Sequence, residues 1–149
     1  MRIWHFPKPT IAQVQGACIA GSFMVANMCD LIVASDDAFF ADPVVITLGA
    51  AAVEVLIHPW MMSIRRAKEM LYTGERMSAE EAHRIGMVSR LAPRAEVDAE
   101  TLKLRIGPQA DALLGQGFGR AETGGRKGPD RRAQRPGRGK LASVVWLTL

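Results

Sequence analysis

The first hundred residues alternate between two hydrophobic patterns. Short, mostly apolar runs are typical of buried strands, and they predict strands at residues 11–15, 31–34, 38–41 and 87–91. Apolar residues that recur every three or four positions are typical of amphipathic helices, and they predict helices at residues 22–28, 63–72, 79–85 and 95–105. Strands interleaved with helices predict an α/β fold with right-handed crossovers.

Capping residues mark several of the predicted helix ends. Ser78 precedes a glutamate by three residues, which is the spacing of a capping box, and Gly86 follows as a stop signal. Gly74 stops the preceding helix in the same way. Residues 44–57 have no clear period: their apolar density suits a buried helix or a loop packed into a cleft, and Gly49 argues against one continuous element.

The stretch from Gln13 to Asp30 predicts a strand, a turn and a short helix. Gly16 ends the strand, and Gly21 with Ser22 opens the helix, with Ser22 as its expected N-cap. A helix start offers backbone N–H groups that lack partners within the helix. Because Gly21 is small, a substrate oxygen can approach these groups, as in one half of an oxyanion hole. A tightly packed turn without any function is the alternative.

The positive charge of the chain lies in its last third. Residues 1–105 carry 11 Lys and Arg against 12 Asp and Glu, whereas residues 106–149 carry 8 against 3. Nine of the 14 glycines lie between Gly107 and Gly139. Such a composition cannot bury enough apolar area to offset its chain entropy. We therefore expect a folded domain at 1–105 and a disordered Gly/Arg/Pro-rich tail at 106–149 that adds little stability.

The composition of this tail has two interpretations. A basic arm for nucleic acid would need aromatic side chains for stacking, and Phe118 stands alone among the glycines. Nucleic-acid binding is therefore not expected. The second interpretation is a reading-frame change in the coding DNA, which a family-like C-terminus in another frame of the genomic sequence would support.

Six ordered blocks of sequence carry a family resemblance. They are K-P-T-I-A-Q-V-Q-G at 8–16, A-G-S at 20–22, A-N-M-C-D-L-I-V-A-S at 26–35, F-F-A-D-P at 39–43, R-A-K-E-M-L-Y-T-G at 66–74 and S-A-E-E-A-H-R-I-G-M-V at 78–88. From Lys8 to about Arg94 the chain resembles the crotonase superfamily, the enoyl-CoA hydratase/isomerase family of fatty acid metabolism.

The resemblance implies a partial crotonase-like fold, a ββα-type spiral, that acts on or binds an acyl-CoA thioester. It implies no cofactor besides the coenzyme A of the substrate, and a trimer-based homo-oligomer in the intact family. Gly21 matches one of the two oxyanion N–H donors, and the other comes from an upstream half that these residues do not include. We therefore expect an impaired or inactive enzyme, prone to aggregation through exposed strands.

Both glutamates of the hydratases are replaced. Met24 and Val44 stand at their positions, and neither can transfer a proton. Glu54 is the candidate base, and His58, four residues later, would lie beside it on a helix. A purely structural pair is the alternative. The expected substrate-binding residues are Ala20, Gly21, Met24, Asp42 and Val44, although Asp42 before Pro43 also fits a turn.

The remaining features exclude several classes of protein. Cys18 and Cys29 cannot define a disulfide framework, and no residue pattern predicts a metal site. No run is long enough to span a membrane, and residues 1–6 do not resemble a secretory signal, so we expect a cytoplasmic protein. The alternative function is a non-catalytic module that docks on intact crotonase-family subunits.

Overall fold

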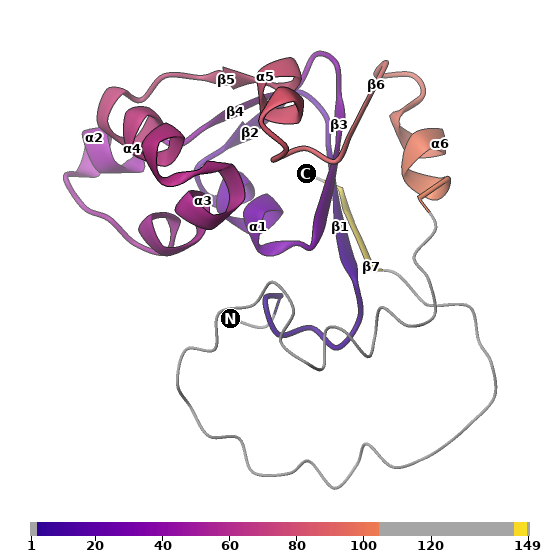
Figure 1. The fold of residues 1–149 in the computed structure, drawn as a ribbon, viewed down its shortest axis with the longest axis horizontal. Helices are drawn as coiled ribbons and strands as arrows, with labels where there is room; N and C mark the ends of the chain where they lie inside the picture. The colour runs from indigo at the N-terminus through magenta and orange to yellow at the C-terminus, as the bar shows by residue number, and fades with distance from the viewer. Residues whose placement is uncertain (1–2, 105–144, 149) are drawn as a thin grey trace, which may run out of the picture.

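The computed structural model describes residues 3–104 and 145–148. Figure 1 shows a mixed α/β fold with two sheets. The strands are β1 (Thr10–Val14), β2 (Ala17–Ile19), β3 (Leu31–Ser35), β4 (Phe39–Ala41), β5 (Met77–Ser78), β6 (Arg90–Ala92) and β7 (Val145–Thr148). The helices are α1 (Gly21–Met28), α2 (Val44–Leu48), α3 (Glu54–Met62), α4 (Ile64–Thr73), α5 (Ala79–Arg84) and α6 (Val97–Leu102).

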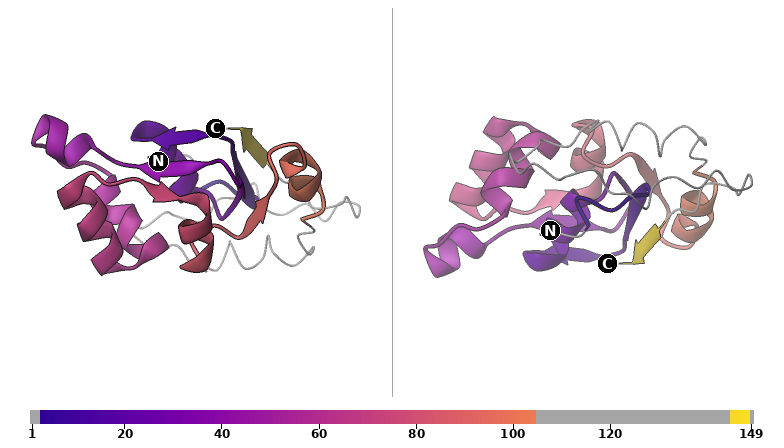
Figure 2. Two further views of the ribbon diagram at one scale, coloured as in Figure 1. Left: turned by 90° about the horizontal axis from the view of Figure 1, so that it is seen from above. Right: turned by 90° about the horizontal axis from the view of Figure 1, so that it is seen from below.

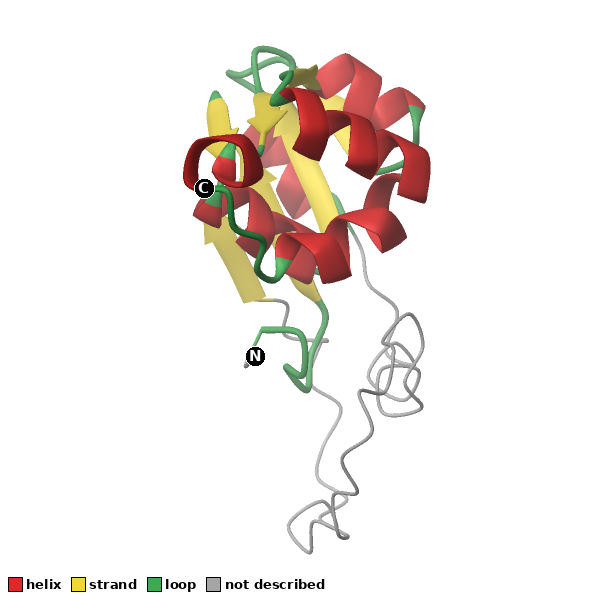
Figure 3. Cartoon of the chain, turned by 90° about the vertical axis from the view of Figure 1, so that its left-hand side faces the viewer, coloured by secondary structure: helices red, strands yellow, loops and turns green. Residues whose placement is uncertain are grey.

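The larger sheet has the order β6-β3-β1-β7 and is parallel throughout. Helices cover both of its faces, because α1 to α5 lie on one side and α6 lies on the other (Figures 1 and 2). Seen from the side of α2 to α4, these helices stand in front of the strands (Figure 3). The smaller sheet has the order β2-β4-β5, in which β4 and β5 run antiparallel.

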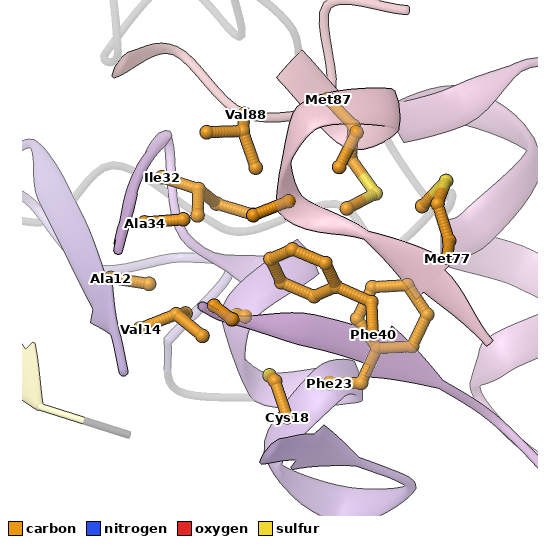
Figure 4. Packing of buried hydrophobic residues seen from close by; sticks show 14 of the residues in the cluster. Ala12, Val14, Cys18, Phe23, Ile32, Ala34, Phe40, Met77, Met87 and Val88 are labelled. Atoms are coloured by element: carbon orange, nitrogen blue, oxygen red, sulfur yellow. The ribbon is translucent and has the colours of Figure 1, made fainter. Parts of the chain in front are cut away.

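Burial explains the pattern of β1, in which all five residues are buried. Ala12 and Val14 face the main core, whereas Ile11 packs with Val33 and Val97 beneath α6. Figure 4 shows the main core gathered around Phe23 and Phe40, whose ring centroids lie 5.4 Å apart. A strand enclosed on both faces needs apolar residues at successive positions, which is why it reads as a run.

The predicted strands and helix stops are largely confirmed. β1, β3 and β4 begin or end within one residue of their predicted bounds. Ser78 caps α5 by accepting a hydrogen bond from the Glu81 N–H at 3.2 Å, and Gly74 ends α4 at a φ of 69°. No helix among the described residues has the length and apolar character to cross a membrane.

Several local predictions need correction. Ser22 is not the N-cap of α1: Ala20 holds that position, and the Ser22 hydroxyl lies 2.9 Å from both N and O of Ile19. The last strand of the main domain begins at Arg90 rather than residue 87, because the Val88 N–H bonds to Ala82 O of α5 at 3.0 Å instead of to β3. The final helix, α6, is shorter than the predicted span of 95–105.

The ambiguous segment 44–57 contains one helix and the start of another. Gly49 ends α2 in the left-handed conformation at a φ of 62°. This glycine separates α2 from α3, in agreement with the prediction that residues 44–57 are not one continuous element. α3 continues through Pro59, although a proline inside a helix removes one backbone hydrogen bond. Glu54 and His58 therefore share one helix, as predicted.

The strand β7 corrects part of the disordered-tail prediction. Val145–Thr148 pair in parallel with β1, and Thr10 lies opposite Val145 in the register. The rest of the predicted tail, residues 105–144 and residue 149, lies outside the described residues. The expectation that the tail adds little stability therefore does not cover residues 145–148.

We expect deletion of residues 145–149 to expose the free edge of β1. Amide hydrogens of β1 that face β7 should exchange roughly tenfold faster or more, because a lost ladder leaves them open to water. Hydrogen–deuterium exchange measures this, with a deletion of residues 140–144 as the control that keeps the strand. Unchanged exchange in β1 would contradict the pairing.

Candidate active site

α1 begins at Gly21, where the sequence predicts an oxyanion donor. Gly21 is exposed and is the first residue of α1, so its N–H has no partner within the helix. Ala20 precedes it with a φ of 51°, and the Ala20 N–H donates to Ala41 O at 2.9 Å. The turn that aims Gly21 is therefore tied to the end of β4.

The described surroundings do not explain the glycine by packing. A Cβ atom added at Gly21 would meet nothing within 4 Å, and its φ is not in the left-handed range. The space beside the N–H is open. This geometry agrees with the approach of a substrate oxygen to the backbone.

Met24 and Val44 lie on two different elements, α1 and α2. Met24 lies one turn into α1, where its N–H donates to Ala20 O at 2.9 Å. Val44 is the first residue of α2, and its N–H donates to Asp42 Oδ1 at 3.2 Å. Both side chains are half-buried, and neither carries a group that can move a proton.

A buried network of hydrogen bonds joins α1, α3 and the end of β4. His58 Nε2 lies 2.9 Å from Asp42 Oδ2, and His58 Nδ1 lies 2.9 Å from Asn27 Nδ2. Asp42 and His58 are fully buried, and Asn27 is 1% exposed. These hydrogen bonds join the end of β4, the middle of α3 and the last turns of α1.

The hydrogen bonds fix one tautomer of His58. The Asn27 amide N–H donates to Nδ1, so the ring proton sits on Nε2 and is donated to the Asp42 carboxylate. Burial lowers the pKa of His58 below its ordinary value of 6.5. This effect is larger than those of Asp42 and Glu54, which raise the pKa. His58 is therefore neutral at pH 7.

Glu54 begins α3 and is fully buried. Its Oε1 accepts a hydrogen bond from the Ala52 N–H at 2.8 Å, and its Oε2 has no partner among the described residues. Glu54 does not hydrogen-bond to His58, because Asp42 and Asn27 occupy both ring nitrogens. The predicted Glu54–His58 pairing is thus replaced by an Asp42–His58 pairing.

The structure brings together some predicted residues and adds one. Asp42 is a buried hydrogen-bond acceptor with both oxygens turned to protein groups, so it is more than the turn residue that Pro43 suggested. Asn27 was missed, although an amide among the apolar residues of a short helix is a usable signal. Such a residue needs a buried polar partner.

Other features of the described surface lie elsewhere. An open groove between α4 and α5 shares no residue with the predicted site; it is lined by Met62, Ser63, Arg65, Arg66, Glu69, Glu81, Arg84 and Ile85. In the part of the chain that the structure describes, no three His, Cys, Asp or Glu side chains gather as a metal site requires. Burial raises the pKa of Cys18 and Cys29 to about 11, so both thiols are protonated at pH 7.

Comparison with known proteins identifies the family of the chain. The family model described as "Enoyl-CoA hydratase/isomerase" matches residues 1–106. The chain belongs to the enoyl-CoA hydratase/isomerase family. The family assignment confirms the crotonase-superfamily resemblance seen in the sequence.

Individual members of the enoyl-CoA hydratase/isomerase family show how much of a relative the chain represents. It is 48% identical over 96 residues to the "Putative enoyl-CoA hydratase EchA13" of Mycobacterium tuberculosis, covering 64% of this chain and 30% of that protein. It is 40% identical over 97 residues to a "Carnitinyl-CoA dehydratase" of Escherichia coli, covering 64% of this chain and 37% of that protein.

Solved structures of the family confirm the fold. The chain superimposes on a probable enoyl-CoA hydratase from Mycobacterium thermoresistibile with a TM-score of 0.69 and 43% identity, covering 78% of this chain and 53% of that one. A probable enoyl-CoA hydratase from Mycobacterium smegmatis gives a TM-score of 0.69 at 44% identity, covering 78% and 52%. The chain thus spans about a third of these curated relatives and about half of these solved structures.

Proposed function

We propose that the chain binds an acyl-CoA thioester, with the carbonyl oxygen at the Gly21 N–H. The observation that carries this proposal is the exposed, unobstructed helix start at Gly21 in a member of the enoyl-CoA hydratase/isomerase family. The α1 dipole adds to the hydrogen bond, since its positive end faces the oxygen. Ala20, Met24 and Val44 would surround the thioester, with Asp42 behind Val44.

Proton transfer in this proposal depends on Glu54, because Met24 and Val44 cannot supply it. The free Oε2 of Glu54 is the carboxylate atom available to accept a proton. Because Glu54 is fully buried, the substrate can contact this oxygen only if it enters the interior or if the structure opens locally. Hydration or isomerisation by this chain alone is therefore strongly impaired in our proposal, and no cofactor beyond the substrate's coenzyme A is involved.

Substituting Gly21 tests the binding proposal. We expect crotonyl-CoA to bind the parent chain and to bind a Gly21→Pro variant roughly tenfold or more weakly, because proline removes the N–H yet suits the first position of a helix. Gly21→Ala keeps the N–H and adds a Cβ atom that meets no neighbouring atom of the chain, so weaker binding in this variant measures obstruction of the substrate rather than loss of the donor.

Isothermal titration calorimetry measures the affinities, and far-UV circular dichroism checks the fold of each variant. Equal affinities for the parent chain and Gly21→Pro would refute the assigned donor. Absence of binding to the parent chain would refute the proposal itself.

A second candidate function follows from the surface of α2, α3 and α4. Large apolar side chains are exposed there, and Leu48, Trp60 and Tyr72 are each at least 70% exposed. Monomeric proteins rarely expose many such groups on adjacent elements. The candidate is a non-catalytic module that docks through this face on an intact family subunit or on further copies of the chain, as in a trimer-based assembly. Light scattering of the chain with and without an intact relative separates these outcomes.

A further inference from the structure

We infer that His58 is a positioning residue that sets the direction of α1, and with it the direction of the Gly21 N–H. This inference rests on the proposed function, because it concerns the donor that receives the thioester oxygen. It assigns a role to the Asn27–His58–Asp42 chain that the reaction itself does not need. His58 touches no substrate in this proposal.

The hydrogen bonds form a closed circuit of contacts that begins and ends on α1. At the start of the helix, the Ala20 N–H donates to Ala41 O, and Asp42 follows Ala41 along the chain. Asp42 accepts from His58, and His58 accepts from Asn27, which lies in the last turns of α1. The circuit of contacts therefore returns to the helix from which it began.

Two points of attachment determine the axis of a rigid helix. Ala20 and Asn27 are seven residues apart, which is about two turns or roughly 10 Å along the axis. Both points are held, through Ala41 and Asp42, by adjacent residues at the end of β4. A helix fixed at two points by one short segment cannot tilt without breaking a buried hydrogen bond, which costs more in the interior than at the surface.

A third contact fixes the ring of His58. The Phe23 ring lies with its centroid 4.4 Å from that of His58, at an interplanar angle of 32°. Phe23 lies on α1 between the two attachment points and is fully buried. His58 thus contacts α1 by one hydrogen bond and one ring face.

Two substitutions separate the hydrogen bonds of His58 from its volume. His58→Gln keeps one donor and one acceptor on neighbouring atoms, so it can still link Asn27 to Asp42. His58→Phe keeps a planar ring against Phe23 but loses both hydrogen bonds. Because His5 is exposed in the described structure, His5→Gln is a control for the loss of a histidine.

The primary measurement is hydrogen exchange at the amides of Ala20 and Met24, whose bonds hold the start of α1. We expect exchange at both to be roughly tenfold faster in His58→Phe and within about threefold of the parent in His58→Gln. The affinity for crotonyl-CoA should follow the same order, with a loss of roughly tenfold, or about 1.4 kcal/mol, in His58→Phe.

Each outcome decides between hydrogen bonding and packing. Equal exchange in all variants, or equal acceleration in both His58 variants, would overturn the inference. If His58→Phe does not fold, Asn27→Leu supplies the comparison, because it breaks the same circuit of contacts at the hydrogen bond between α1 and His58. If the parent chain binds no acyl-CoA, the proposed function fails, but the exchange rates still test the positioning role.

Discussion

Replacing Asp42 with alanine is expected to destabilise the domain by about 1–3 kcal/mol. The carboxylate accepts hydrogen bonds from His58 Nε2 and from the Val44 N–H, and both donors are left without a partner in the variant. A buried donor that loses its partner costs about 1–3 kcal/mol, which applies to His58, whereas the half-buried Val44 N–H can turn to water and adds little. A loss of this size is a large fraction of the stability of an ordinary domain.

Asp42→Asn is the matched control for this prediction. Its side-chain oxygen still accepts one hydrogen bond, and its amide can donate to His58 if the ring changes tautomer. Asn27 can accommodate that change by turning its Oδ1, which has no partner among the described residues, toward the ring. We therefore expect roughly half the loss or less in Asp42→Asn, measured by urea denaturation. Equal stability of the parent chain and Asp42→Ala would show that the buried chain is not a stabilising network.

Local signals in the sequence predicted the elements that depend on local physics. β1 and β3 were predicted because strands enclosed in a parallel sheet form mostly apolar runs. α5 was found because Ser78 and Gly86 satisfy its ends through contacts only a few residues long. β2 was not predicted, because a strand of three residues has too few positions to show a period.

The misplaced cap of α1 has a different cause. A serine before a helix usually accepts an N–H bond from the first turn, but the bond from Ala20 to Ala41 starts this helix one residue earlier than expected. Ser22 is then already inside the helix, and its hydroxyl turns back to Ile19. A contact between β4 and the turn decides the boundary, and the local sequence does not contain it.

The resemblance named candidate residues of the site but not the contacts between them. Gly21, Met24 and Val44 were named because a resemblance carries information about positions in a known fold. The Asp42–His58 and Asn27–His58 contacts join residues 16 and 31 positions apart. Helical spacing favoured Glu54 as the partner of His58, and the closer approach of β4 and α1 in the folded chain overrode that preference.

The purified 149-residue chain is expected to show no detectable hydration of crotonyl-CoA. Neither Met24 nor Val44 can act as an acid or base, and removing such a group typically lowers the rate by about 100- to 10,000-fold. Within these residues the resemblance assigns an oxyanion donor only at Gly21, and loss of one donor costs about 100- to 1,000-fold. Catalytic groups are not additive, but two such losses together bring the rate near background.

Glu54→Gln decides whether the buried carboxylate supplies the missing base. The measurement is the consumption of crotonyl-CoA by the parent chain and by this variant, purified in parallel. Glutamine keeps an oxygen for the Ala52 N–H but cannot accept the proton at Oε2, so the fold is retained while proton transfer is lost. A robust rate in the parent chain that disappears in Glu54→Gln would overturn the inactive interpretation and make Glu54 the base. A rate that persists in the variant would exclude Glu54 and point to a contaminating enzyme or to another base.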